Sequence, residues 1–142
     1  DLAHIAEWAP ALVISLVSHV ELFEAGATAL GQDIQDKGTR WVHMPLRDQG
    51  TPNANFEAAW PSVSDRARRA LAGGGRVLMH CRGGCGRSGM AALRLMIEAG
   101  EPRDAALARL RAVRPCAIET DGQLLWARKA RTQPATDPRG RG

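Results

Sequence analysis

Short apolar runs alternate along the chain with longer segments whose apolar residues recur at helical spacing. The runs typical of buried strands cover residues 12–17, 41–46 and 77–79. Apolar residues three and four positions apart predict helices over about residues 20–30, 56–71, 86–100, 102–115 and 120–130. A first helix is expected over residues 1–9, ended by Pro10, and the polar residues 33–39 are expected to form a loop.

Two details of this pattern can be compared directly with the structure. Pro61 lies inside one predicted helix and is expected to kink it or to restart it at the next residue. The residues expected to face inward from the last two helices are Ala106, Leu110, Val113, Leu124 and Leu125.

The alternation of strands and helices predicts an α/β fold of three layers, with a central, mainly parallel sheet flanked by helices on both faces. In such sheets a ligand binds at the carboxyl ends of the strands. The 142 residues, 44% of them hydrophobic, suffice for one core. We expect a single domain over residues 1–131 and a disordered, polar tail over residues 132–142. Because the chain does not begin with Met, an element before Asp1 is expected to be missing.

A glycine-rich loop follows the third apolar run and opens the next helix. Its glycines, Gly83, Gly84 and Gly86, let the backbone turn tightly, so that its amide N–H groups approach a common centre. The helix that opens near Gly86 points its positive end at the same centre. The loop is therefore predicted to hold an oxyanion, with Arg82 and Cys85 as further members.

Cys81 begins this loop and is the predicted nucleophile. The amides, the helix terminus and the guanidinium of Arg87 all favour thiolate over thiol at this position. Arg87 lies six positions after Cys81. If the loop curls around a tetrahedral anion, the planar guanidinium of Arg87 can therefore bind two of the anion's oxygens. The Ser88 hydroxyl can donate a hydrogen bond to the sulfur when the sulfur is the leaving group. His80 can orient the loop from the end of the strand.

A thiolate that attacks a phosphomonoester needs an acid to protonate the leaving oxygen, and Asp48 is the candidate. It lies in the turn-rich loop 47–53, which leaves the sheet at the same carboxyl edge as the Cys81 loop. The two loops can therefore face one another. Asp65, Asp104 and Asp121 fit less well, since each lies on or beside a helix remote in sequence from this loop.

Gln123 has two interpretations of equal weight from spacing alone. It can aim a water molecule at a phosphocysteine in a second step. It also completes a capping box with Thr120, in which its side chain satisfies the Thr120 backbone and takes no part in the chemistry.

Residues 80–88, with Cys81 and Arg87 separated by five residues, resemble the signature loop of cysteine-dependent protein phosphatases. Together with residues 44–52 and 117–123, they occur in the order seen in dual-specificity phosphatases similar to the cyclin-dependent kinase-associated phosphatase. The resemblance implies Cys81 as nucleophile, Arg87 as phosphate clamp and Asp48 as general acid. It also implies that the region around Gln123 closes the site. Glu119 stands where the related motif usually has glutamine.

The three cysteines do not form a paired disulfide framework in this interpretation. Cys85 is either a small hydrophobic residue or a thiol that traps oxidised Cys81 as a disulfide and so protects it from irreversible oxidation. Cys116 is expected to lie in the core. His80 and the cysteines lack the paired spacing of zinc ligands, so we expect neither a metal nor a cofactor.

Composition limits the partners and the compartment. The net charge of +4 arises from 19 basic against 15 acidic residues, but no basic run is interleaved with aromatic residues, so nucleic acid is not expected. A basic surface also suits an enzyme that captures phosphate dianions. No segment is typical of a membrane span or a signal peptide, so we expect no membrane partner and a reduced cytoplasm as the compartment.

The chain contains no tyrosine and has little room for insertions, which favours a shallow, dual-specificity site over a deep phosphotyrosine site. We expect a monomer that acts on a phosphoprotein or phosphopeptide. The alternatives are a phosphoinositide or other small phosphomonoester phosphatase, a rhodanese-type sulfurtransferase and an inactive phosphate-binding module. The charge of Arg82 favours the first of these, whereas a sulfurtransferase would leave the Asp48 loop without a purpose.

Overall fold

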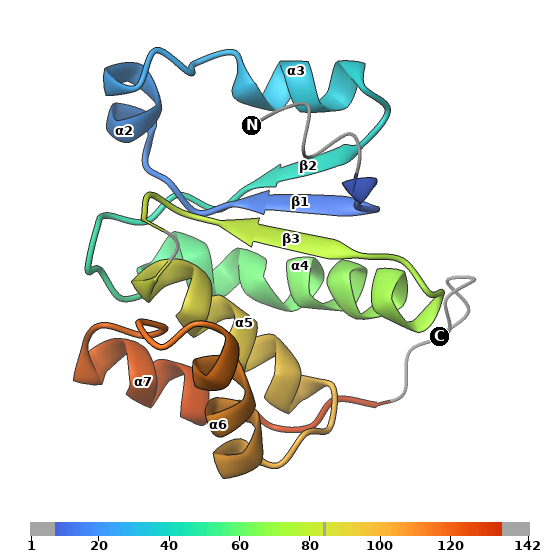
Figure 1. Cartoon of the computed structure of the whole chain (residues 1–142), viewed down its shortest axis with the longest axis vertical. Helices are drawn as coiled ribbons and strands as arrows, with labels where there is room; N and C mark the ends of the chain where they lie inside the picture. The colour runs from blue at the N-terminus through green and yellow to red at the C-terminus, as the bar shows by residue number, and fades with distance from the viewer. Residues whose placement is uncertain (1–7, 84, 135–142) are drawn as a thin grey trace.

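A three-stranded parallel sheet forms the centre of the computed structural model, which describes residues 8–83 and 85–134 (Figure 1). Its strands are β1 (Leu12–Ser15), β2 (Arg40–His43) and β3 (Val77–His80). The helices are α2 (His19–Glu24), α3 (Leu30–Asp36), α4 (Ala54–Ala72), α5 (Gly86–Glu98), α6 (Arg103–Val113) and α7 (Asp121–Arg128). The predicted α/β fold with a parallel sheet is confirmed.

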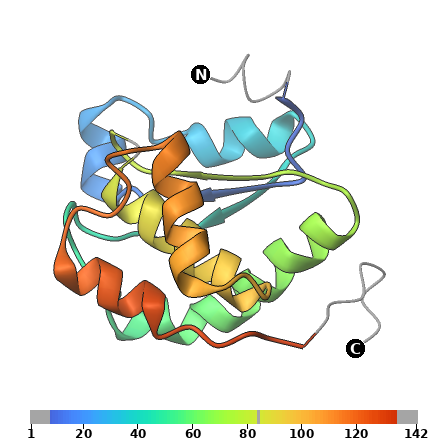
Figure 2. The ribbon, with the colours of Figure 1, turned by 60° about the horizontal axis from the view of Figure 1, so that its bottom comes forward.

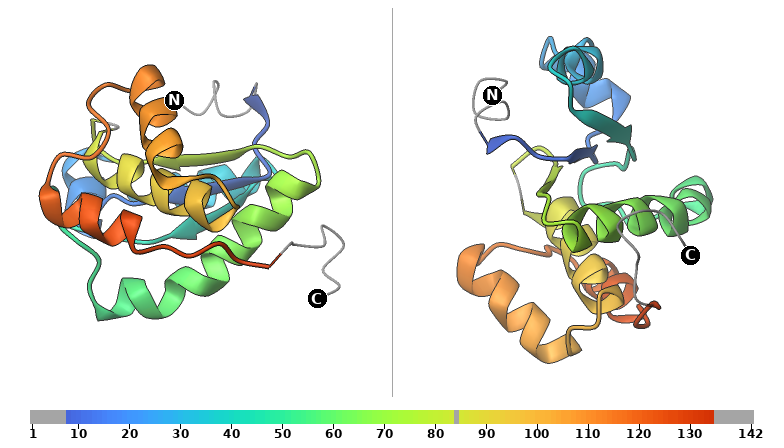
Figure 3. Two further views of the ribbon diagram at one scale, coloured as in Figure 1. Left: turned by 90° about the horizontal axis from the view of Figure 1, so that it is seen from below. Right: turned by 90° about the vertical axis from the view of Figure 1, so that its right-hand side faces the viewer.

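The strand order β2-β1-β3 creates a topological switch point between β1 and β3. The chain passes from β1 to β2 through α2 and α3, and then returns through α4 to the opposite side of β1. Figure 3 shows α2 and α3 on one side of the sheet and α4 to α7 on the other. The segments that leave β1 and β3 therefore diverge at the carboxyl edge, where sheets of this kind bind ligands.

The core lies between the sheet and α4, α5 and α7, and it fixes the direction of α5. All of β1 is buried, as expected for a central parallel strand. The Trp60 ring lies 5.8 Å from the Phe56 ring and 5.4 Å from the Trp126 ring, which joins α4 to α7. The buried Glu98 carboxylate of α5 accepts hydrogen bonds from Trp60 Nε1 (3.0 Å) and Ser64 Oγ (2.6 Å) of α4. The last turn of α5 is thereby held against α4.

The helix predicted over residues 20–30 is instead two helices, and the loop predicted over residues 33–39 is largely helical. Gly26 has a φ of 66°, in the left-handed region, which separates α2 from α3. Residues 30–36 form α3 because Ile34 is fully buried and Gly31 lies against the Trp41 ring with no room for a Cβ atom. Packing on β2 thus outweighs the polar composition of this segment.

The helix α4 is continuous through Pro61, so it does not restart at the next residue. Asn53 caps its start by accepting a hydrogen bond from Phe56 N (2.9 Å). Its buried face spans both sides of Pro61, with Trp60 before it and Val63 after it. We attribute the unbroken helix to this packing, which offsets the hydrogen bond that proline cannot donate.

Other expectations fail at the periphery of the fold. Residues of β3 are only half-buried because β3 is an edge strand of the described sheet. Val113 of α6 and Leu125 of α7 are exposed, at 79% and 60%, where inward positions were expected. The helix predicted over residues 1–9 lies mostly outside the described residues, as does most of the tail predicted over residues 132–142. Among the described helices, none combines the length and the apolar character needed to cross a bilayer.

Candidate active site

Three segments meet at the carboxyl edge of the sheet. Residues 16–18 lead from β1 into α2, residues 44–53 lead from β2 into α4, and residues 81–85 lead from β3 into α5. Figure 2 shows α2 and the starts of α5 and α7 at the same end of the molecule. The site residues predicted from sequence are contributed by these segments and by α5 and α7.

Cys81 follows β3 directly and is the free cysteine of the described residues. Its Sγ lies 3.4 Å from the Oγ of Ser88, which is on the first turn of α5 and 9% exposed. A hydroxyl at this distance can donate to a thiolate, and the positive end of α5 favours negative charge nearby. The Ser88 hydroxyl is therefore within hydrogen-bond reach of the candidate nucleophile.

The loop between Cys81 and α5 turns as its glycines predict. Gly83 has a φ of 84°, in the left-handed region that favours glycine. Gly84, which the sequence also places in the loop, lies outside the described residues. Arg82 is exposed at the rim, with its Nη1 3.7 Å from Glu24 Oε2 of α2. Arg82 thus adds positive charge at the surface of the loop.

The guanidinium of Arg87 is 1% exposed and is held by Glu21, a residue that the sequence interpretation missed. Arg87 Nη1 donates to Glu21 Oε1 (2.5 Å) and to the Leu46 carbonyl (2.9 Å), and Nη2 donates to Glu21 Oε2 (2.8 Å). Glu21 also forms a capping box with Ser18 at the start of α2. That box, at the end of the first predicted strand, was the sequence signal that could have located Glu21.

The pair of Glu21 and Arg87 is electrostatically strong. The two hydrogen bonds from Arg87 lower the pKa of Glu21 to about 2, although partial burial opposes this shift. The same contact raises the pKa of Arg87 above its ordinary value. The guanidinium is therefore fixed in position and charged before any ligand arrives.

Asp48 lies in a tight turn that faces Arg87. Gly50 N donates to the Arg47 carbonyl (2.8 Å), and Gln49 has a φ of 58°. The Asp48 Oδ1 lies 3.7 Å from Arg87 Nη2, and its side chain is 70% exposed. The structure thus brings together the candidate acid, from a loop, and the candidate anion clamp, from the start of α5, which are 39 residues apart in sequence.

His80 is anchored by the buried Ser15, which the half-buried Trp41 also contacts. Its Nε2 makes a short hydrogen bond with Ser15 Oγ, which also accepts a hydrogen bond from Trp41 Nε1 (2.8 Å). If Ser15 also accepted from His80, its buried hydroxyl hydrogen would have no partner among these contacts, which is costly. The hydroxyl therefore donates to Nε2, and the imidazole proton lies on Nδ1.

This environment keeps the His80 ring neutral. Burial lowers the pKa of His80, and the nearby charge of His43 lowers it further. His43 itself stacks on Trp41 at 5.3 Å between ring centroids. These effects favour the neutral imidazole over the cation at the residue that precedes Cys81.

No protein-family model matches the sequence, and no curated protein matches it. Several solved structures, however, are similar to this chain. Tk-PTP in its active form is 28% identical, with a TM-score of 0.74 over 90% of this chain and 82% of that one. Kinase-associated phosphatase with its catalytic-site cysteine changed to serine is 23% identical, with a TM-score of 0.79 over 91% and 72%. PTPMT1 in complex with PI(5)P is 16% identical, with a TM-score of 0.72 over 91% and 84%.

The fold of this chain is that of a dual-specificity phosphatase-like member of the protein tyrosine phosphatase superfamily. The predicted resemblance to this superfamily is thereby confirmed. Its structural neighbours are phosphatases, which supports a phosphatase activity.

In this dual-specificity phosphatase-like protein, Gln123 joins two loops and is fully buried. Its Oε1 accepts a hydrogen bond from Glu119 N (2.9 Å), and its Nε2 donates to the Gly50 carbonyl (3.2 Å). Thr120 Oγ1 accepts from Gln123 N (3.1 Å), which is one half of the expected capping box. The other half differs, because the Gln123 side chain reaches the amide of Glu119 rather than that of Thr120.

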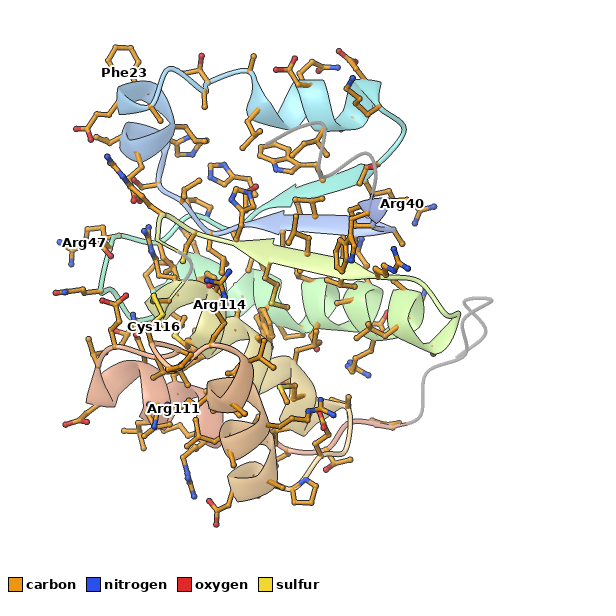
Figure 4. All side chains as sticks on the ribbon, in the orientation of Figure 1. Phe23, Arg40, Arg47, Arg111, Arg114 and Cys116 are labelled. Atoms are coloured by element: carbon orange, nitrogen blue, oxygen red, sulfur yellow. A yellow bond between two sulfur atoms is a disulfide. The ribbon has the colours of Figure 1, made fainter. Side chains whose placement is uncertain are left out.

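Cys85 forms a disulfide with Cys116, with 5.2 Å between their Cα atoms. Figure 4 labels Cys116 and draws the bond beside it. The expectation that the cysteines form no disulfide is therefore wrong. Cys116 is also exposed rather than in the core. Neither role expected of Cys85 describes this bond, since its partner lies 31 residues away and is brought near only by the fold.

A cavity of about 570 Å³ extends from the site of this phosphatase-like fold along β3. Its walls are mostly apolar side chains of β3, α5 and α6, and it reaches Cys81 and Ser88. Residues 8–83 and 85–134 contain no group of three or more His, Cys, Asp or Glu side chains placed to hold a metal ion.

Proposed function

We propose that this protein hydrolyses phosphomonoesters of phosphoproteins, on tyrosine and on serine or threonine, through a phosphocysteine intermediate. The observation that carries the proposal is the convergence of Cys81, Arg87 and Asp48 at one end of the sheet. Ser88 Oγ lies 3.4 Å from the Cys81 sulfur, and Asp48 lies 3.7 Å from the Arg87 guanidinium. A nucleophile, an anion clamp and an acid are the parts that phosphoryl transfer to sulfur requires.

In the first step the Cys81 thiolate attacks phosphorus. The S–P bond forms as the bond between phosphorus and the ester oxygen breaks. Asp48, as the carboxylic acid, gives its proton to that oxygen, so that an alcohol or a phenol leaves. Loop amides and the charge on Arg87 stabilise the phosphoryl oxygens.

In the second step water attacks the phosphocysteine. Asp48, now a carboxylate, takes a proton from the water, and the S–P bond breaks to release inorganic phosphate. The Ser88 hydroxyl donates a hydrogen bond to the departing thiolate, a role supported by its 3.4 Å distance from Sγ. No cofactor takes part in either step.

An exposed site favours a protein substrate. Asp48 is 70% exposed and Arg82 is 64% exposed, so both can meet a phosphorylated side chain at the surface of another protein. The partner we propose is a phosphopeptide segment, met by a monomer in the cytoplasm.

Release of phosphate from a small aryl phosphate, measured from pH 5 to 8 in EDTA, tests this function. We expect activity in EDTA for the wild-type protein and none for Cys81→Ser. Asp48→Ala should be slower by about 10²–10⁴-fold and should lose the decline of rate at alkaline pH. Asp65→Asn changes an aspartate paired with Arg69 on α4 and serves as the matched control. Activity that persists in Cys81→Ser would exclude the phosphocysteine.

A phosphoinositide or other lipid phosphomonoester is the second candidate substrate. The apolar cavity that reaches Cys81 favours a lipid substrate, because its apolar lining can contact a hydrocarbon chain beside the reactive sulfur. The similar fold of PTPMT1, solved with PI(5)P, is compatible with such a ligand. Comparing kcat/KM for phosphopeptides and for phosphoinositides in mixed micelles distinguishes the two.

A further inference from the structure

The segment from Cys116 to Glu119 is fastened to the phosphate loop by three contacts. The disulfide joins Cys116 to Cys85. Ile118 N donates to the Cys85 carbonyl (3.3 Å). Gly86 N donates to Glu119 Oε1 (2.9 Å). These contacts involve the two residues at which the loop becomes α5.

Ile118 is held in a conformation that a β-branched residue rarely adopts. Its φ is 69°, in the left-handed region, where its side chain crowds the backbone. Such backbone strain persists only where surrounding contacts impose it. Here Ile118 is 6% exposed and its amide packs against Gly89, where a Cβ atom would lie 2.9 Å away. The segment is therefore constrained on both sides of Ile118, by the disulfide before it and by the Glu119 contact after it.

The Glu119 carboxylate accepts a hydrogen bond from an amide that the proposed function assigns to a phosphoryl oxygen. Gly86 N is the first amide of α5, where partial positive charge is greatest. A carboxylate there satisfies the amide in the absence of ligand. It also places negative charge beside the position that a phosphate dianion would take, and two like charges so close repel each other.

We propose that Glu119 is a built-in competitor of the phosphoryl group and that the Cys85–Cys116 disulfide holds it in place. This inference rests on the proposed function of the loop. Reduction of the disulfide releases the strain at Ile118, lets Glu119 withdraw from Gly86 and tightens oxyanion binding. Oxidation restores the competitor, and Cys81 takes no part in the Cys85–Cys116 disulfide.

The redox step is an ordinary thiol–disulfide exchange. A dithiol reductant transfers two electrons and two protons, the S–S bond breaks, Cys85 and Cys116 become thiols, and the reductant becomes a disulfide. Hydrogen peroxide reverses the change: two thiols lose two electrons and two protons, and the peroxide becomes two molecules of water.

Binding of inorganic phosphate, measured by calorimetry, tests the proposal without any need for turnover. All proteins carry Cys81→Ser, so that the nucleophile itself cannot be oxidised. For the protein with Cys85 and Cys116 intact, we expect reduction by dithiothreitol to lower the Kd for phosphate by about tenfold, the scale of one like charge removed at close range. Cys116→Ser should bind as tightly as the reduced protein in either condition.

Glu119→Gln should also bind tightly, and its affinity should not respond to dithiothreitol. Glu101→Gln, which alters an exposed glutamate paired with Arg109, is the matched control and should respond as the parent protein does. Equal phosphate affinity before and after reduction, or weaker binding by Glu119→Gln, would overturn the proposal and leave the proposed function intact. Failure of every variant to bind phosphate, with melting temperatures unchanged, would instead remove the proposed function and this inference with it.

Discussion

The Arg87 guanidinium and the Glu21 carboxylate meet through two parallel hydrogen bonds, of 2.5 and 2.8 Å, across the switch point of the sheet. Arg87 comes from the helix after β3, and Glu21 comes from the helix after β1. A bidentate pair fixes the plane of the guanidinium as well as its position. The remaining donors of Arg87 are thereby oriented without help from a ligand.

Glu21→Gln is expected to lower kcat/KM for an aryl phosphate by about 10²-fold, the cost typical of a small misplacement of a catalytic group. Glutamine offers one acceptor where Arg87 now has two, so the guanidinium can rotate. Glu24→Gln, which changes an exposed glutamate on the same helix, should retain activity. A fully active Glu21→Gln protein would show that the loop alone orients Arg87.

The same pair predicts a pH dependence of stability. Because the pKa of Glu21 falls from 4.5 to about 2 on folding, its ionised form stabilises the folded state above pH 4.5. This contribution is lost as the pH falls from about 4.5 to about 2. Urea unfolding at intervals from pH 2.5 to 7 should show wild type more stable than Glu21→Gln at neutral pH, with the difference shrinking below pH 4.5. A difference that is constant across this range would contradict the assignment.

The sequence contained the chemistry of the loop but not the partners that hold it. Cys81, Arg87 and Ser88 lie within eight consecutive positions, so strand, turn and helix signals place them together. Asp48 could be predicted because parallel strands share a carboxyl edge. Glu21 was missed because its contact with Arg87 spans 66 positions and depends on the order of the strands. The split between α2 and α3 was missed because packing on Trp41, rather than local composition, determines it.

The contact from Ser15 to His80 predicts a single tautomer for the buried imidazole. Nitrogen chemical shifts should show the His80 proton on Nδ1 in the wild-type protein, and burial, which lowers the pKa of His80, should keep the ring neutral at neutral pH. In Ser15→Ala, Nε2 loses its donor, so the second tautomer should appear.

Trp41→Phe distinguishes the effect of the Ser15 hydroxyl on the tautomer from the effect of the Trp41 indole. It keeps an aromatic ring beside His43 but removes the N–H that occupies Ser15 Oγ. The Ser15 hydroxyl hydrogen still needs His80 Nε2 as its acceptor, so the Nδ1 tautomer is expected to persist in this variant. An unchanged Nδ1 tautomer in both variants would mean that the loop backbone, rather than Ser15, determines the proton position.

Gln123→Ala tests whether Gln123 ties the loops together or aims a water molecule. Loss of the side chain leaves Glu119 N and the Gly50 carbonyl without their partner, at a cost of about 1–3 kcal/mol in unfolding free energy. Since Gly50 lies two positions after Asp48, the turn that carries the acid should loosen. The first chemical step should then slow, most of all for esters with poor leaving groups, and no phosphocysteine should accumulate.

A water-positioning role for Gln123 predicts the opposite kinetics. Only the second step would slow, so rapid mixing would show a burst of the leaving alcohol followed by a slow steady state. Gln133→Ala, which removes an exposed side chain bonded to the Arg131 carbonyl, is the matched control for loss of a glutamine. Both Oε1 and Nε2 of Gln123 already bond backbone groups, so we do not expect Gln123 to position water. We therefore expect no burst for either variant. Only Gln123→Ala should be slow.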